Sequence, residues 1–349
     1  MNVTMYVMHF SWLTAPRPIV ALAPMAGVTD ASYRQLIKKI APEVIVYTEF
    51  LSTDAIHYGA RKTMELLSFD PSLERPFIVQ VFGKDPHHFL TAAKIVEDLG
   101  ADGIDINMGC PAAKVVSSCH GSSLIRQPEL AAELVHATKK AVNISVSVKT
   151  RLGWDTPDTL IPFCQKLVEA GADALAIHGR RYCDKFTGKA DWQPIYELKK
   201  HVSVPVIGNG DIASAADAVA KIGNLDGVMV GRGTFGNPWV MAEIVDALKR
   251  STVAAVETRD WFDTAHHRPR VTTGGTAIAT VAPLSFHDKI PFILEHCALA
   301  VRIKGERRGM LEMRRHLSSY VKGFDGASAM RMQLMQVERL ADAQAILCG

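Results

Sequence analysis

The sequence of 349 residues lacks several features that mark particular protein classes. It has no Cys-x-x-Cys pair, and its six cysteines are scattered along the chain, which argues against a disulfide scaffold or a zinc knuckle. No stretch approaches the ~18 apolar residues of a membrane span. The first basic residue is Arg17, so the charged start of a signal peptide is missing. We therefore expect a cytoplasmic protein with no membrane partner and no metal.

A large excess of one charge sign is also absent, because 39 Lys and Arg are nearly balanced by 36 Asp and Glu. A net charge of +3 does not by itself indicate a nucleic-acid partner. The distribution is less even, since residues 301–331 carry eight Lys or Arg against three Asp or Glu. This basic block has two interpretations: a helix face exposed to solvent, or a surface that binds phosphates.

What the sequence does contain is a regular alternation of short apolar runs and helical patterns. The runs are nearly continuous in Val, Ile, Leu or Ala, as is typical of parallel strands buried on both faces. They are Ile19–Pro24, Val44–Glu49, Phe77–Phe82, Gly103–Asn107, Ser145–Lys149, Ala174–His178, Val204–Asn209 and Gly227–Gly231. Eight such units within ~250 residues predict a (β/α)8 TIM barrel. A Rossmann-type sheet is disfavoured because no G-x-G-x-x-G follows the first run.

The alternation stops after Arg250, which predicts three segments. Residues 1–250 form the barrel, and residues 251–286, which show no clear period, form an irregular connection. In residues 287–349 apolar residues return at helical spacing, which predicts a small C-terminal helical domain.

Polar residues follow the predicted strands at the ends where barrels carry their active sites. Gly208-Asn209-Gly210-Asp211 and Gly231-Arg232-Gly233 follow the last two strands, where barrels often bind phosphate through backbone N–H groups. Lys149 ends a predicted buried strand, where an unpaired ammonium is costly. It therefore needs an anionic partner, or it lies on the surface beyond the barrel rim. Gln80 lies inside a predicted strand, and its side-chain amide needs hydrogen-bond partners. The edge of a heteroaromatic ring would supply them. His178 is either a site residue or a core histidine.

Cys110 lies between Gly109 and Pro111 on a loop at this same end. A cysteine can act there as a nucleophile, a metal ligand or a proton donor. Metal ligation lacks further cysteines at suitable spacing, and no paired base for a nucleophile is identifiable. Proton donation is the simplest role, and it suits a reaction in which another agent delivers a hydride.

Five motifs in register resemble the tRNA-dihydrouridine synthases, and most closely their bacterial branch. They are Ala23-Pro24-Met25-Ala26-Gly27-Val28-Thr29-Asp30, Asp105-Ile106-Asn107-Met108-Gly109-Cys110-Pro111-Ala112-Ala113-Lys114-Val115, Ile177-His178-Gly179-Arg180, Asn209-Gly210-Asp211-Ile212 and Gly231-Arg232-Gly233. The likeness runs from about Pro18 to Leu248 and resumes more weakly at Leu311–Leu317 and Tyr320–Gly323.

This resemblance implies an FMN-binding barrel followed by a tRNA-binding helical domain. The reaction it implies is reduction of the C5–C6 double bond of tRNA uridines, with NADPH or NADH as reductant and Cys110 protonating C5. The implied cofactor contacts are Ala23, Pro24, Met25, Gln80, Lys149, His178, Asn209, Gly210, Asp211, Gly231 and Arg232. We expect substrate contacts at Asn107, Arg151, Arg180, Arg314 and Arg315.

Two alternatives remain open from the sequence. An FMN barrel that acts on a free pyrimidine, as dihydroorotate dehydrogenases do, would not need the basic helical segment. A non-catalytic RNA-binding module would not need Cys110 and Lys149 at strand ends. The tRNA reductase explains all three features, and we expect it to be a monomer.

Overall fold

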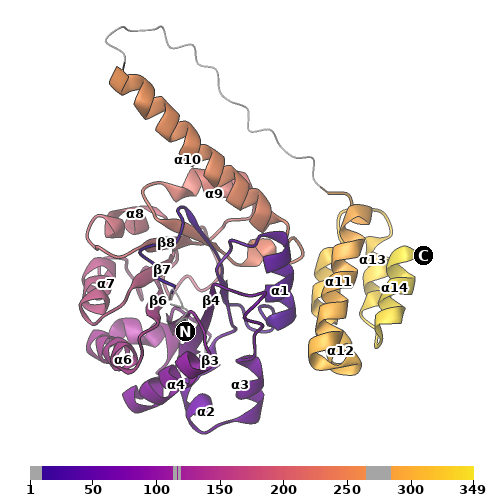
Figure 1. Cartoon of the computed structure of the whole chain (residues 1–349), viewed down its shortest axis with the longest axis horizontal. Coiled ribbons are helices and arrows are strands. Elements are labelled where there is room, and N and C mark those ends of the chain that lie inside the picture. The colour runs from indigo at the N-terminus through magenta and orange to yellow at the C-terminus, as the bar shows by residue number, and fades with distance from the viewer. Residues whose placement is uncertain (1–9, 113–115, 117–118, 265–283) are drawn as a thin grey trace, which may run out of the picture.

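The computed structural model describes residues 10–112, 116, 119–264 and 284–349, and it contains a parallel barrel followed by helices (Figure 1). The strands are β1 (Ile19–Leu22), β2 (Val46–Tyr47), β3 (Leu51–Ser52), β4 (Phe77–Phe82), β5 (Gly103–Met108), β6 (Ser145–Arg151), β7 (Ala174–His178), β8 (Val206–Asn209) and β9 (Gly227–Val230). All pair in parallel, in the order β1-β9-β8-β7-β6-β5-β4-β2. A bridge between Ala21 and Ile45 closes the ring, which confirms the predicted (β/α)8 barrel.

Helices follow the strands and cover the outside of the barrel. They are α1 (Ala31–Ile40), α2 (Thr53–His57), α3 (Arg61–Leu66), α4 (Pro86–Asp98), α6 (Pro128–Ala141), α7 (Leu160–Glu169), α8 (Gln193–Lys199), α9 (Ala215–Ile222) and α10 (Val240–Thr264). No helix in the described part of the chain is both long and apolar enough to span a membrane.

The second predicted strand is divided, because β2 and β3 both pair with β4 but at different points along it. The ladder changes at Thr48, whose Oγ1, and not a backbone carbonyl, accepts the N–H of Gln80 at 2.9 Å. A side chain thus replaces one ladder bond, which a pattern of apolar residues does not reveal.

The barrel interior changes from apolar to polar along its axis. At the end where the strands begin, Trp12 is fully buried and packs in one cluster with Ile19, Ile45 and Ile207. Toward the ends where the strands finish, the buried interior side chains include Gln80, Asp105, Asn107, Ser147 and Asn209. This polar layer lies beneath the rim, and it supports whatever binds there.

The irregular connection predicted for residues 251–286 is wrong for residues 251–264, which continue α10 as a helix. Figure 1 shows this part of α10 projecting beyond the barrel. Apolar periodicity reveals a helix only where one face is buried, so a projecting helix escapes such a prediction. Residues 265–283 lie outside the described residues, and the predicted division into domains stays a prediction.

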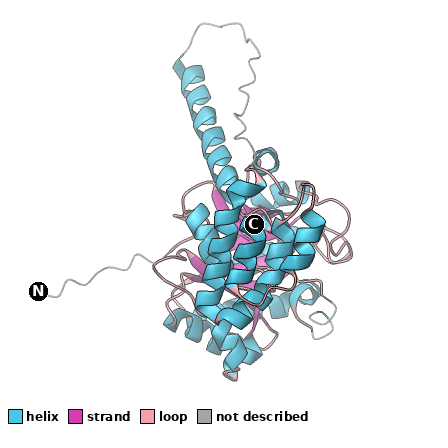
Figure 2. Ribbon diagram, turned by 90° about the vertical axis from the view of Figure 1, so that its right-hand side faces the viewer, coloured by secondary structure: helices cyan, strands magenta, loops and turns pink. Residues whose placement is uncertain are grey.

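The C-terminal helices are α11 (Phe286–Lys304), α12 (Glu306–Tyr320), α13 (Ala327–Leu334) and α14 (Leu340–Cys348). They have their own apolar core, which includes Ile293, Met310, Met313 and Leu317. Figures 1 and 2 show them side by side as one layer next to α1.

Buried polar groups join this layer to the barrel. Asp30 caps α1 by accepting the N–H of Tyr33 at 2.9 Å, and its other oxygen pairs with Lys304 at the end of α11. Lys304 also pairs with Glu312 on α12. The Tyr33 hydroxyl donates to the Thr234 carbonyl at 2.7 Å. One aspartate therefore serves both the start of α1 and the contact between the two layers.

Replacing Asp30 with Asn should destabilise the protein by roughly 2–4 kcal/mol at pH 7, because the buried Lys304 ammonium loses a carboxylate partner. Asn caps helices as well as Asp does, so the loss reports the charge. Burial raises the pKa of Asp30, but Lys304 and two histidines lower it by more, and the net pKa lies below its ordinary value. Because the pKa of Asp30 is lowered in the folded protein, its carboxylate stabilises the folded state at pH values above the ordinary Asp pKa. That stabilisation is lost as the pH falls below this value, so the difference in unfolding free energy between the two proteins should shrink below about pH 4.

Urea unfolding of both proteins at several pH values measures this difference. Asp98→Asn, which changes an exposed carboxylate at the end of α4, is the matched control and should stay within about 0.5 kcal/mol of wild type. An Asp30→Asn loss of the same size at pH 7 and pH 3 would contradict the role of the charge.

Candidate functional site at the carboxyl ends of the strands

A cavity of about 620 Å³ opens at the carboxyl ends of the barrel strands. Thirteen of the seventeen residues predicted for the site line it: Ala23, Pro24, Met25, Asn107, Cys110, Lys149, Arg151, His178, Asn209, Gly210, Asp211, Gly231 and Arg232. The strand-end rule therefore brings together residues from six strands. Gln80, Arg180, Arg314 and Arg315 do not line this cavity.

Gln80 is fully buried beneath the cavity, and its amide is held by protein partners. Its Nε2 donates to Asp105 at 2.7 Å, and its Oε1 accepts from Asn107 Nδ2 at 2.8 Å. Asp105 accepts in turn from the Ser147 hydroxyl at 2.6 Å. Gln80 thus has a positioning role. By accepting from Asn107 Nδ2, it leaves the Asn107 amide oxygen directed at the Cys110 loop.

The Cys110 loop is held from three directions. Asn107 Oδ1 accepts the N–H groups of Gly109 at 3.1 Å and of Cys110 at 2.9 Å. Arg151 Nε donates to the Gly109 carbonyl at 2.7 Å, and the Cys110 carbonyl accepts from Ser122 N–H at 3.1 Å. The thiol is free and half-buried in the cavity wall. Asn107 and Arg151 therefore act here by positioning Cys110.

Lys149 brings a positive charge into the cavity without a partner. No hydrogen bond or ion pair to its ammonium occurs within the described residues. Burial, with a further contribution from Arg151, lowers the pKa of Lys149 to about 8. Beneath it, burial raises the pKa of Asp105 to about 6. A cation that is desolvated in this way is stabilised by an anionic or electron-rich ligand.

His178 lies in the same wall as a neutral imidazole. Its Nδ1 is buried and has no partner among the described residues. Burial lowers the pKa of His178 to about 2, and four cations add to the shift: Lys149, Arg151, Arg180 and Arg232. An orphaned buried polar atom of this kind is expected where a ligand completes the hydrogen bond.

The loops after β8 and β9 bring residues with free backbone N–H groups to the cavity wall. Those of Gly210, Asp211, Ile212, Gly231, Arg232 and Gly233 have no acceptor in the described part of the chain. Gly210 and Asp211 both have positive φ, of 126° and 51°, which turns the backbone at this point. Loops at this place in a barrel bind phosphate through such groups.

Asp211 holds this region together from below. Arg180 Nη2 donates to both of its carboxylate oxygens at 2.8 Å, and Ala190 N–H donates to Oδ2 at 2.7 Å. Arg180 also donates to the carbonyls of Thr187 and Gly188. Arg180 is only 3% exposed, and its Nε and Nη2 brace this loop, while its Nη1 is buried without a partner among the described residues. The substrate contact predicted for Arg180 stays a prediction.

Arg314 and Arg315 lie on α12 and have different surroundings. Arg314 donates to the carbonyls of Gln336 and Val337 at 3.1 and 3.0 Å, so it connects α12 to the segment before α14. Arg315 is exposed and donates to the Gly27 carbonyl at 3.1 Å, next to Ala26 in the cavity wall. Only Arg315 is therefore placed at the cavity mouth.

Some of the positive charge in the basic block of residues 301–331 is paired with acidic residues of the protein itself. Lys304 pairs with Asp30 and Glu312, and Arg308 pairs with Glu65 and Glu312. Much of the positive charge thus stabilises contacts within the protein, which a count of charges along the sequence does not register.

Two aromatic residues of the cavity were missed by sequence reasoning. Phe50 directly follows the second predicted strand, so the strand-end rule could have found it. Phe186 is 60% exposed at the mouth, with the Arg151 guanidinium 5.7 Å from its ring centre. It lies well beyond the end of β7, and no pattern in the sequence marks it.

The site as a whole combines a free thiol, an unpaired ammonium and a set of phosphate-type N–H groups within one cavity. This arrangement can bind a phosphorylated ligand with a flat, electron-rich ring and can deliver a proton to a substrate above it.

Comparisons with known proteins agree on one family. A family model described as dihydrouridine synthase (Dus) matches residues 21–348. The chain is 35% identical to a probable tRNA-dihydrouridine synthase 1 of Synechocystis sp. over 331 residues, covering 94% of this chain and 85% of that relative. It is 36% identical to tRNA-dihydrouridine synthase B of Pseudomonas aeruginosa over 344 residues, covering 98% and 94%.

A solved structure supports the fold alone. A 2-naphthoyl-CoA reductase complex aligns with a TM-score of 0.51 at 12% identity, covering 65% of this chain and 50% of that one. The shared part is consistent with the barrel.

The His178 imidazole should not titrate between pH 5 and pH 8, because its pKa is lowered to about 2. Side-chain ¹⁵N NMR of the histidines measures this, and the signal missing from His178→Gln assigns the resonance. A His178 midpoint within that pH range would contradict the buried, cation-surrounded environment.

Proposed function

The chain belongs to the dihydrouridine synthase family, and from this premise we propose that it reduces the C5–C6 double bond of uridines in tRNA, with Cys110 as the proton donor. The observation that carries the proposal is the Cys110 thiol, held in the wall of a cavity that also presents the unpaired Lys149 ammonium. The family match disfavours a free pyrimidine as substrate and a non-catalytic RNA-binding role.

The family is flavin-dependent, and the residues of the cavity fit FMN. The six free N–H groups after β8 and β9, with Arg232, suit a phosphate. Lys149 and the orphaned Nδ1 of His178 suit the polar edge of a flavin ring, where negative charge gathers on reduction. Ala23, Pro24 and Met25 would form the opposite wall, while Gln80 supports Asn107 from below.

The chemistry divides between the cofactor and the protein. A reduced flavin bound in the cavity would supply hydride chemistry, and C6 of the uracil would be the acceptor. Cys110 gives its thiol proton to C5, and the loop contacts of Asn107 and Arg151 hold the thiol in place during that transfer. Lys149 stabilises negative charge in the cavity at neutral pH. We propose NADPH or NADH as the reductant, and the cytoplasm, where tRNA is modified, as the location.

The substrate uridine must leave its stack in folded tRNA to reach the cavity. Phe186 and Phe50 provide aromatic faces at or near the mouth against which a base can stack. Arg315 extends from α12 to the Gly27 carbonyl beside the cavity wall, and it is placed to contact a phosphate of the tRNA backbone. Arg314, which holds the helical layer together, is not needed for that contact.

Replacing Cys110 with Ala should separate the two half-reactions. Oxidation of NADPH by the bound flavin should stay close to wild type, because that step needs no proton at uracil C5. Dihydrouridine formation should fall by ~10²–10⁴-fold, the usual contribution of a positioned acid. Rapid quench of reduced enzyme mixed with tRNA measures the second step. The control is Cys348→Ala, an exposed thiol on α14, and wild-type tRNA reduction by Cys110→Ala would refute the role.

Replacing Arg315 with Gln should weaken tRNA binding by removing one phosphate contact. The slope of log affinity against log salt should become shallower by about 0.7–0.9. Arg250→Gln, which changes an exposed arginine on α10, should leave both quantities unchanged. Filter binding over a range of salt concentrations measures the slopes, and a wild-type slope for Arg315→Gln would remove Arg315 from the tRNA contact.

A further inference from the structure

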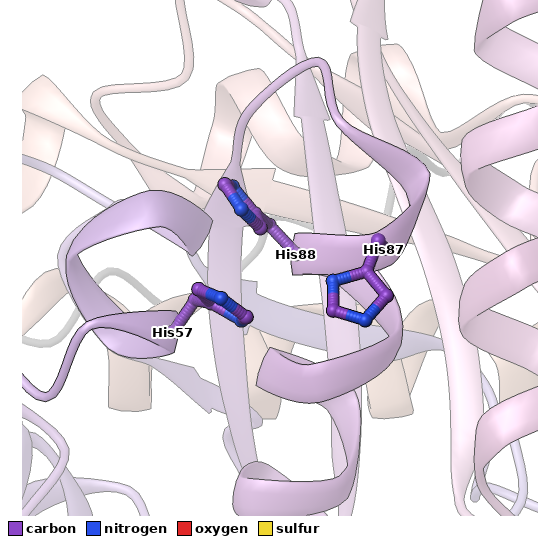
Figure 3. Close-up of side chains that lie close together, drawn as sticks. All are labelled: His57, His87 and His88. Atoms are coloured by element: carbon purple, nitrogen blue, oxygen red, sulfur yellow. The ribbon is translucent and has the colours of Figure 1, made fainter.

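Three histidines form a cluster outside the cavity, between the end of α2 and the start of α4 (Figure 3). His57 is the last residue of α2, and His87 and His88 lie in the first turn of α4. One ring nitrogen from each lies within 4.8 Å of the others. Sequence reasoning expected no metal site and did not single out this cluster, because His57 is distant from the other two along the chain.

The backbone and one ring of the cluster are held in place by two aspartates. Asp85 caps α4, and its Oδ1 accepts the N–H groups of His87 at 2.8 Å and of His88 at 3.4 Å. Asp54 Oδ1 lies 2.7 Å from His88 Nδ1. A carboxylate in this position keeps the proton on Nδ1, so the lone pair of His88 is on Nε2. This is the arrangement that carboxylates give to metal-binding histidines.

Two further atoms of the cluster have unused bonding capacity. His57 Nδ1 is buried without a partner among the described residues, which is costly for a polar atom. Asp85 Oδ2 makes no hydrogen bond with the described residues, and it lies 4.0 Å from His88 Nε2. His87 is exposed, so an ion can enter from solvent.

We propose that His57, His87 and His88 bind a divalent metal ion of the zinc class. Asp85 lies outside this close group of three nitrogens, and its exposed side chain would turn Oδ2 toward the ion as a fourth ligand. Imidazole nitrogens suit Zn²⁺, and three histidines with one carboxylate complete a tetrahedral set of the closed, structural kind. Nitrogens bound to Zn²⁺ at ~2.1 Å lie about 3.4 Å apart, so binding draws the rings together by roughly 1 Å. Two ring rotations supply this movement. The exposed His87 turns toward the others, and His57 leaves its stack on His88, in which the two ring centres are 4.2 Å apart.

The ion would connect two loops on the catalytic rim. The α2 helix follows β3, and α4 follows β4, so both begin at the carboxyl ends of strands. Phe50, just before β3, lines the cavity and packs edge-on against Phe82 at the end of β4, with ring centres 5.6 Å apart. The role of the metal would be to stiffen this side of the rim, because its ligand set leaves no open position for substrate.

Equilibrium dialysis of the untagged, full-length protein against Zn²⁺ tests the proposal. We expect one Zn²⁺ per chain that is lost, or weakened more than about tenfold, in His57→Ala and in His88→Ala. Asp54→Asn should weaken binding by about 10–100-fold, because it removes only the orienting carboxylate. Asp85→Asn keeps the helix cap and tests the fourth ligand alone. His136→Ala, an exposed histidine on α6, is the matched control and should bind as wild type does.

Co²⁺ in place of Zn²⁺ distinguishes the histidine cluster from the free cysteines, four of which are not buried. A tetrahedral Co²⁺ spectrum without a thiolate charge-transfer band, and absent from His57→Ala, is the expected result. Circular dichroism of each variant shows whether it is folded. Zn²⁺ bound with unchanged affinity by folded His57→Ala and His88→Ala, or a Co²⁺ spectrum with thiolate ligands, would overturn the proposal, as would the absence of binding to wild type.

Discussion

The excess of positive charge at the carboxyl ends of the strands is the constraint on which the site depends. Lys149 has no anionic partner among the described residues, and burial together with the nearby cations lowers the pKa of His178 and keeps its imidazole neutral. Asp211 compensates Arg180 and part of the charge of Arg232, and Asp105 lies buried below. The positive charge that remains favours a bound anion, and free N–H groups at this place in a barrel are typical of phosphate sites. The protein is therefore arranged to be complete when its cofactor is in place.

The barrel could be predicted from the sequence because each of its strands carries a local signal. The bounds of β4 and β7 were predicted to the residue, since each is a short apolar run that begins and ends at a clear boundary. The failures occur where a long-range partner decides the structure. Thr48 divides the second strand through one side-chain hydrogen bond, and α10 continues past Arg250, where the sequence shows no clear period and the helix projects beyond the barrel (Figure 1).

The site shows the same division between local and tertiary information. Residues at the ends of strands and in the loops that follow reach the rim, so Lys149, Cys110 and His178 could be placed by position alone. The contacts of each side chain could not be predicted in this way. Gln80 is likewise a polar residue in an apolar run, yet its neighbours Asp105 and Asn107 use its amide within the barrel. Arg180 likewise follows β7 but turns down to Asp211, and the structure alone distinguishes a brace from a ligand contact.

The segment from Met25 to Asp30 explains how the helical layer can act on a reaction inside the barrel. Its first residue lines the cavity, and Thr29 Oγ1 holds the Met25 N–H at 3.0 Å. Gly27, at φ of 69°, donates its N–H to Glu49 at 2.6 Å and accepts from Arg315 of α12. Asp30, its last residue, pairs with Lys304 of α11. A tRNA that contacts the helical layer thus contacts elements bonded directly to the cavity wall.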